Sequence, residues 1–466
     1  MLFNSIHFFF FLPVITALYY LLPEARRWLL ILLASCYFYT AFFWPYLFLL
    51  FLLIGIDFYA GKLIEKAQGK QRKRYLWISI AANIGLLSIF KYSNFVLFNF
   101  NEIALLVGSS FQVKQLNLLL PIGLSFHTFQ SLSYMIDVYR GKQKAETDLR
   151  VYANYVLFFP QMVAGPIERF SQLGVQFHQQ VKFQVMSIVS GLRLVMYGLF
   201  VKMCVADPLA EIVTRVYDEP STYSSISVLI ALFCFSIQIY ADFHGYSTIA
   251  IGAARMLGVE LMDNFNRPYF ASDIHAFWQR WHISLTNWFR EYVYYPLGGN
   301  RVSKNRWMFN IMLVFMLSGL WHGASWTFVV WGALHGFLYL IWFYVKGKST
   351  APITDPIFRK VSILATFFLV SLIWVFFRSA DFYQVGQIFS ALVHPKNDTQ
   401  LLLPDAFALI PLVFFIMLEY QRRGERFDLW FSRHKEAVRW GYYAFFLAAI
   451  LLLSGIHTHP FIYFQF

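Results

Sequence analysis

The sequence is poor in charged residues. Only 14% of its 466 residues are Asp, Glu, Lys or Arg, whereas an ordinary soluble domain carries about 25%. Hydrophobic residues make up 58% of the chain and aromatic residues 20%. Charge is missing altogether from several long runs, which lie at 75–90, 223–241, 309–345, 361–377 and 440–464. This composition excludes a soluble globular protein.

The sequence also lacks the patterns of several common sites. The three cysteines, Cys36, Cys204 and Cys234, lie in apolar segments without metal-ligand spacing, so we expect them to pack. The chain has no nucleophile elbow, P-loop, dinucleotide-binding glycine loop or H-E-x-x-H motif. His457 and His459 have no third ligand nearby in the sequence, and we predict no metal. No histidine is followed at the fifth position by aspartate, which excludes the usual glycerolipid acyltransferase motif.

The charge-free runs have about the length of membrane-spanning helices. They predict an all-α polytopic transmembrane helix bundle of about ten to twelve spans, forming a single domain over 1–466. A transmembrane β-barrel is unlike this pattern, because its strands alternate polar and apolar residues. The 37-residue run at 309–345 suits two short spans or a broken pair. Apolar segments broken by Pro, Gly and isolated polar residues predict re-entrant helices around a central tunnel.

Membrane topology accounts for the net charge of +13, so no nucleic-acid partner is predicted. Residues 62–74 hold six basic residues and one acidic residue, and 422–439 are also basic. Basic loops mark the cytoplasmic side, which places both termini outside. The N-terminal segment has no basic region or cleavage site typical of a signal peptide, and we predict a retained first helix.

A polar stretch at 261–308 interrupts the apolar runs. It carries six basic and three acidic residues and is predicted to be a cytoplasmic-facing amphipathic belt. Within it, large apolar residues recur at helical spacing: Ile274, Phe277, Trp278, Trp281, Leu285, Trp288, Phe289 and Tyr292. The pattern predicts one amphipathic helix, stopped by "PLGGN". An interfacial helix in the headgroup plane explains the tryptophans, but it does not require His282 at the edge of the aromatic face.

His322 and Asp242 are the candidate site residues at membrane depth. His322, in "SGLWHGASW", lies within the 37-residue charge-free run, which is predicted to contain the catalytic helices (309–345). It either makes an interhelical hydrogen bond or acts as a general base, since a neutral imidazole can take a hydroxyl proton. Asp242 directly follows 19 uncharged residues, and its carboxylate either snorkels from a helix end or lines a wet, substrate-binding cavity.

Several motifs together resemble one enzyme family. "FWQRWHISLTNWFREYVYYPLGGNR", "SGLWHGASWTFVVWGALHG", "LPIGLSF", "AGPIERF", "DNFNRPY" and "PFIYFQF" are similar to those of membrane-bound O-acyltransferases, over nearly the whole chain. Within that family the likeness is to bacterial alginate and peptidoglycan O-acetyltransferases. The resemblance implies a ring of helices around a tunnelled centre, with His322 as the catalytic histidine and His282 as a second characteristic polar residue. Where close relatives usually have "DFSGYSD", this chain has "DFHGYST", with His244 and Thr248 substituted.

The resemblance implies an acetyltransferase of the bacterial inner membrane. Acetyl would come from cytoplasmic acetyl-CoA, with no tightly bound cofactor, and would go to an extracytoplasmic polysaccharide such as alginate, peptidoglycan or another exopolysaccharide. We expect substrate contacts from Arg280, Arg290, Arg301, Asp242 and Trp321, with the arginines meeting CoA phosphates. The expected partners are membrane lipid and a periplasmic or secreted acetyltransferase or esterase-like protein. Two alternatives are a polysaccharide exporter or flippase without acyl transfer, and a lipid or protein acyltransferase of the same superfamily.

The aromatic C-terminal segment "HTHPFIYFQF" carries a further hypothesis. It is predicted to lie on the outer side, where an aromatic membrane anchor is the simpler interpretation. Alternatively it folds back, and the phenol of Tyr463 accepts acetyl transiently. His322 would remove the phenol proton, because a phenol with a pKa near 10 needs a base at neutral pH.

Overall fold

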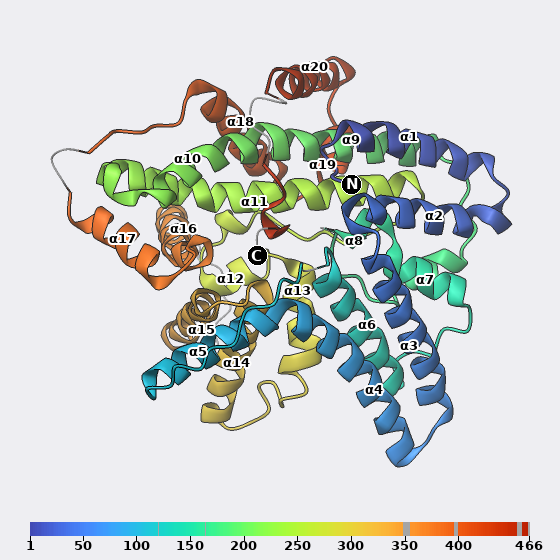
Figure 1. Cartoon of the computed structure of the whole chain (residues 1–466). Helices are drawn as coiled ribbons and strands as arrows, with labels where there is room; N and C mark the ends of the chain where they lie inside the picture. The colour runs from blue at the N-terminus through green and yellow to red at the C-terminus, as the bar shows by residue number, and fades with distance from the viewer. Residues whose placement is uncertain (120, 164, 348–354, 396–398, 454–458, 465–466) are drawn as a thin grey trace. The chain divides into compact units, whose positions relative to one another are not determined.

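The computed structural model describes residues 1–119, 121–163, 165–347, 355–395, 399–453 and 459–464, and over these residues the chain forms helices and no β-strand (Figure 1). Seven helical segments of this described part are long and apolar enough to cross a membrane: Tyr46–Lys66, Gly69–Leu106, Val185–Asp218, Ser225–Met256, Trp326–Lys346, Pro356–Arg378 and Glu436–Leu453. The all-α polytopic prediction is confirmed. The count of ten to twelve spans and the central tunnel stay predictions.

The chain divides into two compact units, one of residues 1–188 with 253–261 and one of residues 189–252 with 262–466. The first unit holds α1 (Ile6–Leu21), α2 (Glu24–Phe43), α3 (Tyr46–Lys66), α4 (Gly69–Leu87), α5 (Ser93–Leu106), α6 (Leu124–Tyr139), α7 (Leu149–Leu157) and α8 (Phe159–Met162). The predicted single domain is not tested by this division and stays a prediction.

The second unit carries all the predicted site residues. Its helices, apart from the first turn of α9 and the last turn of α11, are α9 (Val185–Phe200), α10 (Asp207–Asp218), α11 (Ser225–Met256), α12 (Ile274–Trp278), α13 (Ile283–Phe289), α14 (Lys304–His322), α15 (Trp326–Lys346), α16 (Pro356–Arg378), α17 (Phe382–Val393), α18 (Ala406–Arg422), α19 (Phe427–Ser432) and α20 (Glu436–Leu453). Between α9 and α10 the helix widens into a π-helical stretch, η3 (Val201–Ala206).

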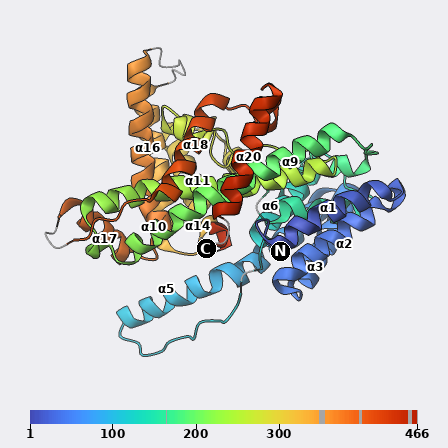
Figure 2. The ribbon, with the colours of Figure 1, turned by 90° about the horizontal axis from the view of Figure 1, so that it is seen from above.

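Glycine pairs bring α9 and α11 into close contact. A Cβ on Gly198 would lie 2.6 Å from the carbonyl oxygen of Gly245, and one on Gly252 would lie 2.6 Å from that of Gly191. Figures 1 and 2 both show the two helices side by side. Membrane helices approach this closely where small residues remove the side-chain spacer. The contact fixes α11, which carries Asp242, against the helix that leads into η3.

The charge-free run at 309–345 lies in a helical hairpin of α14 and α15, of which α15 is a candidate span. α14 ends at His322, and α15 begins after Ser325, whose hydroxyl caps the helix by accepting from the backbone amide of Thr327. A Cβ on Gly319 would lie 2.1 Å from the carbonyl oxygen of Phe328, so only glycine allows this approach. The hairpin places His322 at its turn.

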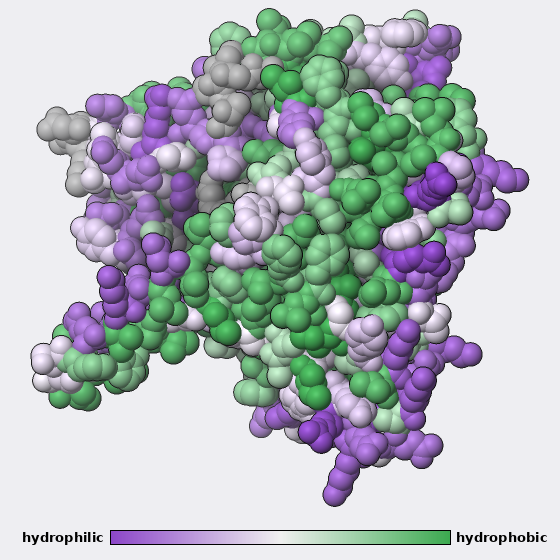
Figure 3. Space-filling model, turned by 45° about the vertical axis from the view of Figure 1, so that its right-hand side comes forward, coloured by the Kyte–Doolittle hydropathy of each residue, from purple (hydrophilic) through white to green (hydrophobic). Residues whose placement is uncertain are grey.

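Apolar side chains cover much of the surface. On the face in Figure 3, hydrophobic residues form a broad continuous area, and hydrophilic residues gather at its margins. Many of the large exposed side chains lie on the candidate spans, among them Phe48, Leu52, Phe337, Leu364 and Leu451. A soluble monomer rarely exposes so large an apolar area, and such a surface is typical of a protein surrounded by lipid.

Candidate active site

His322 lies in an aromatic enclosure at the turn of the α14–α15 hairpin. The residue is 4% exposed, and its ring centroid is 5.3 Å from those of Trp331 and Phe377. Trp331 comes from α15 and Phe377 from α16. The ring of Tyr463, from the C-terminal segment, completes the enclosure at 5.5 Å. The histidine predicted to be catalytic is therefore buried among aromatic rings.

His282 breaks the helix that the aromatic periodicity predicts. The single amphipathic helix over 274–292 is wrong: α12 ends at Trp278, and α13 begins at Ile283. His282 caps α13 with a left-handed backbone (φ 42°), which is uncommon for a residue with a side chain. The eight large apolar residues of the pattern are all buried in the protein, and His282 is 0% exposed. The belt is thus built into the protein at this point, and its histidine lies in the interior.

Asn264 fixes the tautomer of His282. The Asn264 side-chain oxygen accepts from the backbone amide of Ser284 at 3.3 Å and from its hydroxyl at 2.9 Å. Because this oxygen is an acceptor, the proton of His282 must lie on Nδ1, which is 3.1 Å away. Burial lowers the pKa of His282 to about 3, so the ring is neutral at physiological pH. Its Nε2 then carries a lone pair.

The two histidines and Tyr463 form one cluster. The ring centroids of His282 and His322 are 6.4 Å apart, and the Tyr463 ring is 6.5 Å from His282. The Tyr463 hydroxyl oxygen is buried and has no hydrogen-bond partner in the part of the chain that the structure describes. Burial raises the pKa of this phenol well above its usual range, with a further contribution from Asp242. The phenol stays protonated unless a base removes its proton.

The Asp242 carboxylate is buried and already has bonding partners within the protein. Its carboxylate makes an ion pair with Lys202 at 2.6 Å and accepts from the backbone amide of Ile462 at 2.7 Å. The residue is 2% exposed and does not snorkel to a surface. A direct contact with substrate stays a prediction, and it would have to displace one of these partners. Neither Lys202 nor Asn264 was among the residues that the sequence singled out.

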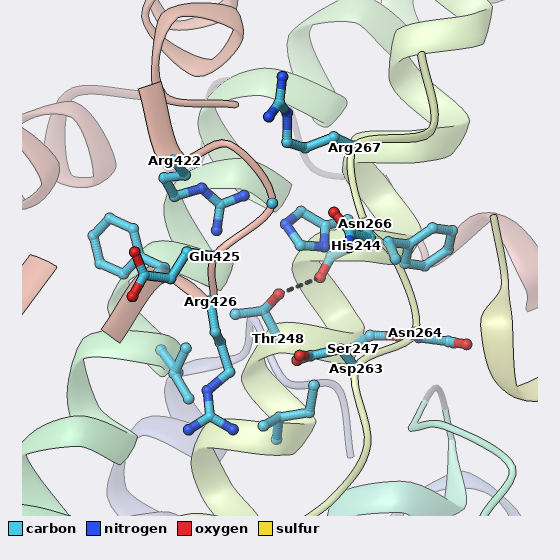
Figure 4. Close-up of a pocket in the computed structure, with 15 residues that line it drawn as sticks. His244, Ser247, Thr248, Asp263, Asn264, Asn266, Arg267, Arg422, Glu425 and Arg426 are labelled. Carbon is cyan, nitrogen blue, oxygen red and sulfur yellow. Dashed lines mark hydrogen bonds between the residues drawn. The ribbon is translucent and has the colours of Figure 1, made fainter. Parts of the chain in front are cut away.

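The predicted donor-binding arginines lie apart from a small polar cavity of about 30 Å³ (Figure 4), which has room for about one water molecule. Arg290 and Arg301 are exposed, and Arg280 is half-buried with a hydrogen bond to the Phe270 carbonyl oxygen. The arginines that line the cavity are instead Arg267, Arg422 and Arg426. None of these three was predicted, and the cavity as it stands is too small for a nucleotide.

The two substituted positions of the "DFHGYST" motif also line this cavity, as Figure 4 shows. The Thr248 hydroxyl donates to the His244 carbonyl oxygen at 2.7 Å, one turn back along α11. The His244 ring stacks on Tyr240 at 5.3 Å. Asn264, which holds His282, lies on the same cavity wall. Asn264 therefore connects the two substituted positions to the candidate active site, because it lines the same cavity as they do and also holds His282.

Two further residues lie near His322. Trp321 is buried, and its ring centroid is 6.2 Å from that of His282, so it stays a candidate for substrate contact. His335 is fully buried among Trp278, Trp331 and other rings, which fits a packing role. The residues that the structure describes contain no group of three possible metal ligands, and His457 lies outside them.

The sequence matches known proteins over most of its length. The sequence model of MBOAT, the membrane-bound O-acyltransferase family, matches residues 147–385, which include both histidines of the cluster. A protein named probable alginate O-acetylase AlgI in Pseudomonas putida is 33% identical over 99% of each chain. This chain belongs to the membrane-bound O-acyltransferase family.

Other relatives carry names of the same kind. The probable alginate O-acetylase AlgI of Pseudomonas aeruginosa is 37% identical over 84% of this chain and 74% of its own. The peptidoglycan O-acetyltransferase of Helicobacter pylori is 35% identical over 84% of this chain and 80% of its own. The protein is thus a multi-pass membrane O-acyltransferase, and family membership favours acyl transfer over the exporter alternative. Tyr463 lies beyond the residues that the family model matches.

Proposed function

We propose that the protein takes acetyl from cytoplasmic acetyl-CoA and passes it across the bacterial inner membrane for O-acetylation of an extracytoplasmic polysaccharide. The names of its relatives, which are O-acetylases of alginate and an O-acetyltransferase of peptidoglycan, support the acetyl group and the class of acceptor. The acceptor polymer stays open among alginate, peptidoglycan and other exopolysaccharides. No resident cofactor is proposed, because the thioester itself supplies the activated acyl group.

The convergence of His322, His282 and Tyr463 carries this proposal. A buried base beside a buried hydroxyl is the arrangement that activates a weak oxygen nucleophile. His322 takes the phenol proton as the Tyr463 oxygen attacks the thioester carbonyl. The carbon–sulfur bond breaks, and the proton passes from His322 to the departing CoA thiolate. The product of this half-reaction is an acetyl ester on Tyr463.

The second half-reaction removes the acetyl group from Tyr463. A serine hydroxyl of the periplasmic or secreted partner attacks the aryl ester, which is a good acetyl donor. The oxygen–carbonyl bond to Tyr463 breaks, the phenol regains a proton, and acetyl moves to the partner and then to the polymer. This order explains how a membrane protein with no soluble domain in its described part reaches a long glycan.

His282 has a supporting role in this scheme. Polarising the thioester carbonyl requires a hydrogen-bond donor, whereas the tautomer fixed by Asn264 leaves an acceptor at Nε2. The geometry therefore favours His282 as the group that orients a hydroxyl by accepting its hydrogen bond, since a thioester has no N–H or O–H to donate. The left-handed backbone that holds the ring in the interior is a strained conformation of the kind that clusters at functional sites.

Basic residues are proposed to attract the anionic donor, acetyl-CoA, to the cytoplasmic face of the protein. Arg290 and Arg301 are exposed and free to reach CoA phosphates, while Arg280 is half-buried. Arginine binds phosphate with several N–H groups at once. We place Trp321 and Asp242 as candidates for contact with the acyl end.

The proposal is tested with the purified protein in lipid nanodiscs and radiolabelled acetyl-CoA. Wild-type protein should release CoA and transfer label to itself or to an added periplasmic partner. His335→Phe serves as a matched control, because it alters a buried histidine of the same hairpin outside the cluster. Failure of the wild-type protein to turn over acetyl-CoA, with a partner present, would contradict the proposed donor.

A further inference from the structure

A cluster of three charged side chains lies deep inside the second unit. Lys202 is 1% exposed and makes ion pairs with Asp207 at 2.7 Å and with Asp242 at 2.6 Å. Lys202 comes from the π-helical stretch η3, Asp207 from the start of α10, and Asp242 from α11. A π-helical turn inside a long helix frequently marks a functional position. The reaction proposed above uses none of these groups as acid, base or nucleophile.

The three side chains do not balance one another. Two carboxylates face a single ammonium, so the cluster carries one excess negative charge whenever both carboxylates are ionised. A buried charge is costly unless it is paired and hydrogen-bonded. Further hydrogen-bond donors to the carboxylates lower this cost.

The C-terminal tail, residues 459–464, supplies these donors. The backbone amide of Ile462 donates to Asp242 at 2.7 Å, and the backbone amide of His459 donates to Asp207. Each carboxylate of the cluster thus receives Lys202 and one amide of the tail. Hydrogen bonds to charged groups are stronger than those between neutral groups, so these two hold the tail more firmly than ordinary backbone contacts.

Aromatic packing sets the direction of the tail. The Phe461 ring stacks on Tyr246 of α11 with centroids 4.5 Å apart. The Tyr463 ring lies 4.5 Å from that of Phe243, and Phe243 in turn lies 4.7 Å from His282. Asp242, Phe243 and Tyr246 are close neighbours on α11, so one helix face receives both the amide and the rings of the tail.

We infer that Lys202, Asp207 and Asp242 form a latch that holds the C-terminal tail in place and thereby positions Tyr463 beside His322. In the latch they act as positioning residues, and this role requires no contact with a reacting atom. The latch rests on the proposed function only for what Tyr463 does once it is held. Whether the tail is held is a separate question with its own measurement.

The test measures access to the tail and needs no enzyme activity. The reporter is the full-length protein in nanodiscs with Tyr463→Cys and Cys36→Ala, since the other two cysteines are buried. The rate of alkylation by a maleimide reports how often the tail leaves its site. Asp242→Asn, which weakens the latch, and Ile462→Pro, which removes the amide donor and also replaces the buried isoleucine side chain with a proline ring, should each raise this rate at least tenfold. Proline is tolerated at Ile462 because it is the first residue of a short helix.

Asp428→Asn is the matched control. Asp428 is also buried and ion-paired, to Arg426, and it accepts a hydrogen bond from the Ser190 hydroxyl of α9. Its substitution should leave the alkylation rate unchanged. If Asp242→Asn does not yield folded protein, Ile462→Pro decides alone. An alkylation rate within twofold of the reporter in folded Ile462→Pro would overturn the latch.

The outcomes distinguish the latch from the proposed transfer of acetyl through Tyr463. Full acetyl-CoA turnover and partner acetylation by Tyr463→Phe would contradict the role of the phenol in acetyl transfer. This result would not contradict the latch. A latch variant with a released tail and lost turnover, in a protein of normal size-exclusion profile and thermal stability, supports both. A purely structural ion cluster would instead lower stability while the tail stayed protected.

Discussion

The two regions that meet at the candidate active site are held by opposite means. The α14–α15 hairpin, which carries His322, contains no charged residue between Phe309 and Val345 and packs backbone against backbone through Gly319. The tail, which carries Tyr463, is held by ring contacts with α11 and through the buried charges of Lys202 and its two carboxylates. His322, the proposed base, lies on closely packed helices, whereas Tyr463, the proposed nucleophile, lies on a terminal segment that is held in place by the latch.

This difference has a chemical consequence. A group that only moves a proton must stay fixed relative to the reacting atoms, and a site on packed helices provides that precision. A group that carries acetyl must be reached first by the donor and then by the acceptor. A segment held at a few points can be positioned firmly and still be presented to a partner protein.

Removing the base from the hairpin should have the largest effect. His322→Ala is expected to lower acetyl transfer by about 100- to 10,000-fold, the usual loss for a general base. The protein should remain inserted and folded, because the side chain packs through contacts with neighbouring rings. Initial rates in nanodiscs, at matched protein amounts, measure the loss. Polymer acetylation at the wild-type level would remove His322 from the mechanism.

Removing the second histidine should have a smaller effect. His282→Ala is expected to lower turnover by about 10- to 100-fold, less than loss of the base. Asn264→Ala frees the tautomer without removing the ring and should cost less than His282→Ala. Both are read as kcat and KM for acetyl-CoA. If binding and turnover survive in His282→Ala, the residue serves packing alone.

Disturbing the packing of the hairpin should lower stability. Gly319→Ala would bring a methyl group to 2.1 Å from the Phe328 carbonyl oxygen, and overpacking of this kind costs about 1–3 kcal/mol. Thermal unfolding in detergent should show a lowered Tm. Gly386→Ala, on α17, is a matched control because its added Cβ meets nothing within 4 Å. Equal Tm values for the two variants would contradict the close contact of α14 and α15.

The exposed arginines should have the smallest effect and should change KM alone. Arg290→Gln with Arg301→Gln is expected to raise KM for acetyl-CoA a few-fold and to weaken its dependence on salt, because charges at the surface are screened. The rate at saturating acetyl-CoA should be unchanged. A fall in kcat with constant KM would show that these residues do not serve the donor phosphates.

Much of the hairpin could be predicted from the sequence, because hydrophobicity and the absence of charge are local signals. The 37-residue run gave two helices and set His322 apart as the polar residue between them. The buried aromatic residues of 274–292 were also recognised by their spacing. The break at His282 was not, because periodic hydrophobicity continues across it and a left-handed backbone leaves no trace in the pattern.

The latch was missed because its parts are distant in sequence. Lys202 and Asp207 stand within a long apolar stretch, and ionisable residues at membrane depth are expected to pair and to be functional. That signal alone marks Lys202 as important, but it cannot name Asp242 or the amide of Ile462 as partners. Asn264 gives even less, since a single asparagine in a polar segment is ordinary. Tyr463 beside His322 is the arrangement that the fold-back hypothesis requires.

The most direct test of the account is to locate acetyl on the protein itself. Wild-type protein is incubated with acetyl-CoA in the absence of any partner, and the C-terminal peptide is analysed by mass spectrometry. We expect one acetyl group on Tyr463 of the wild-type protein and none in His322→Ala. The acetyl group should leave Tyr463 when a competent periplasmic partner is added. An unlabelled tail in a protein that turns over acetyl-CoA, together with full activity of Tyr463→Phe, would contradict it.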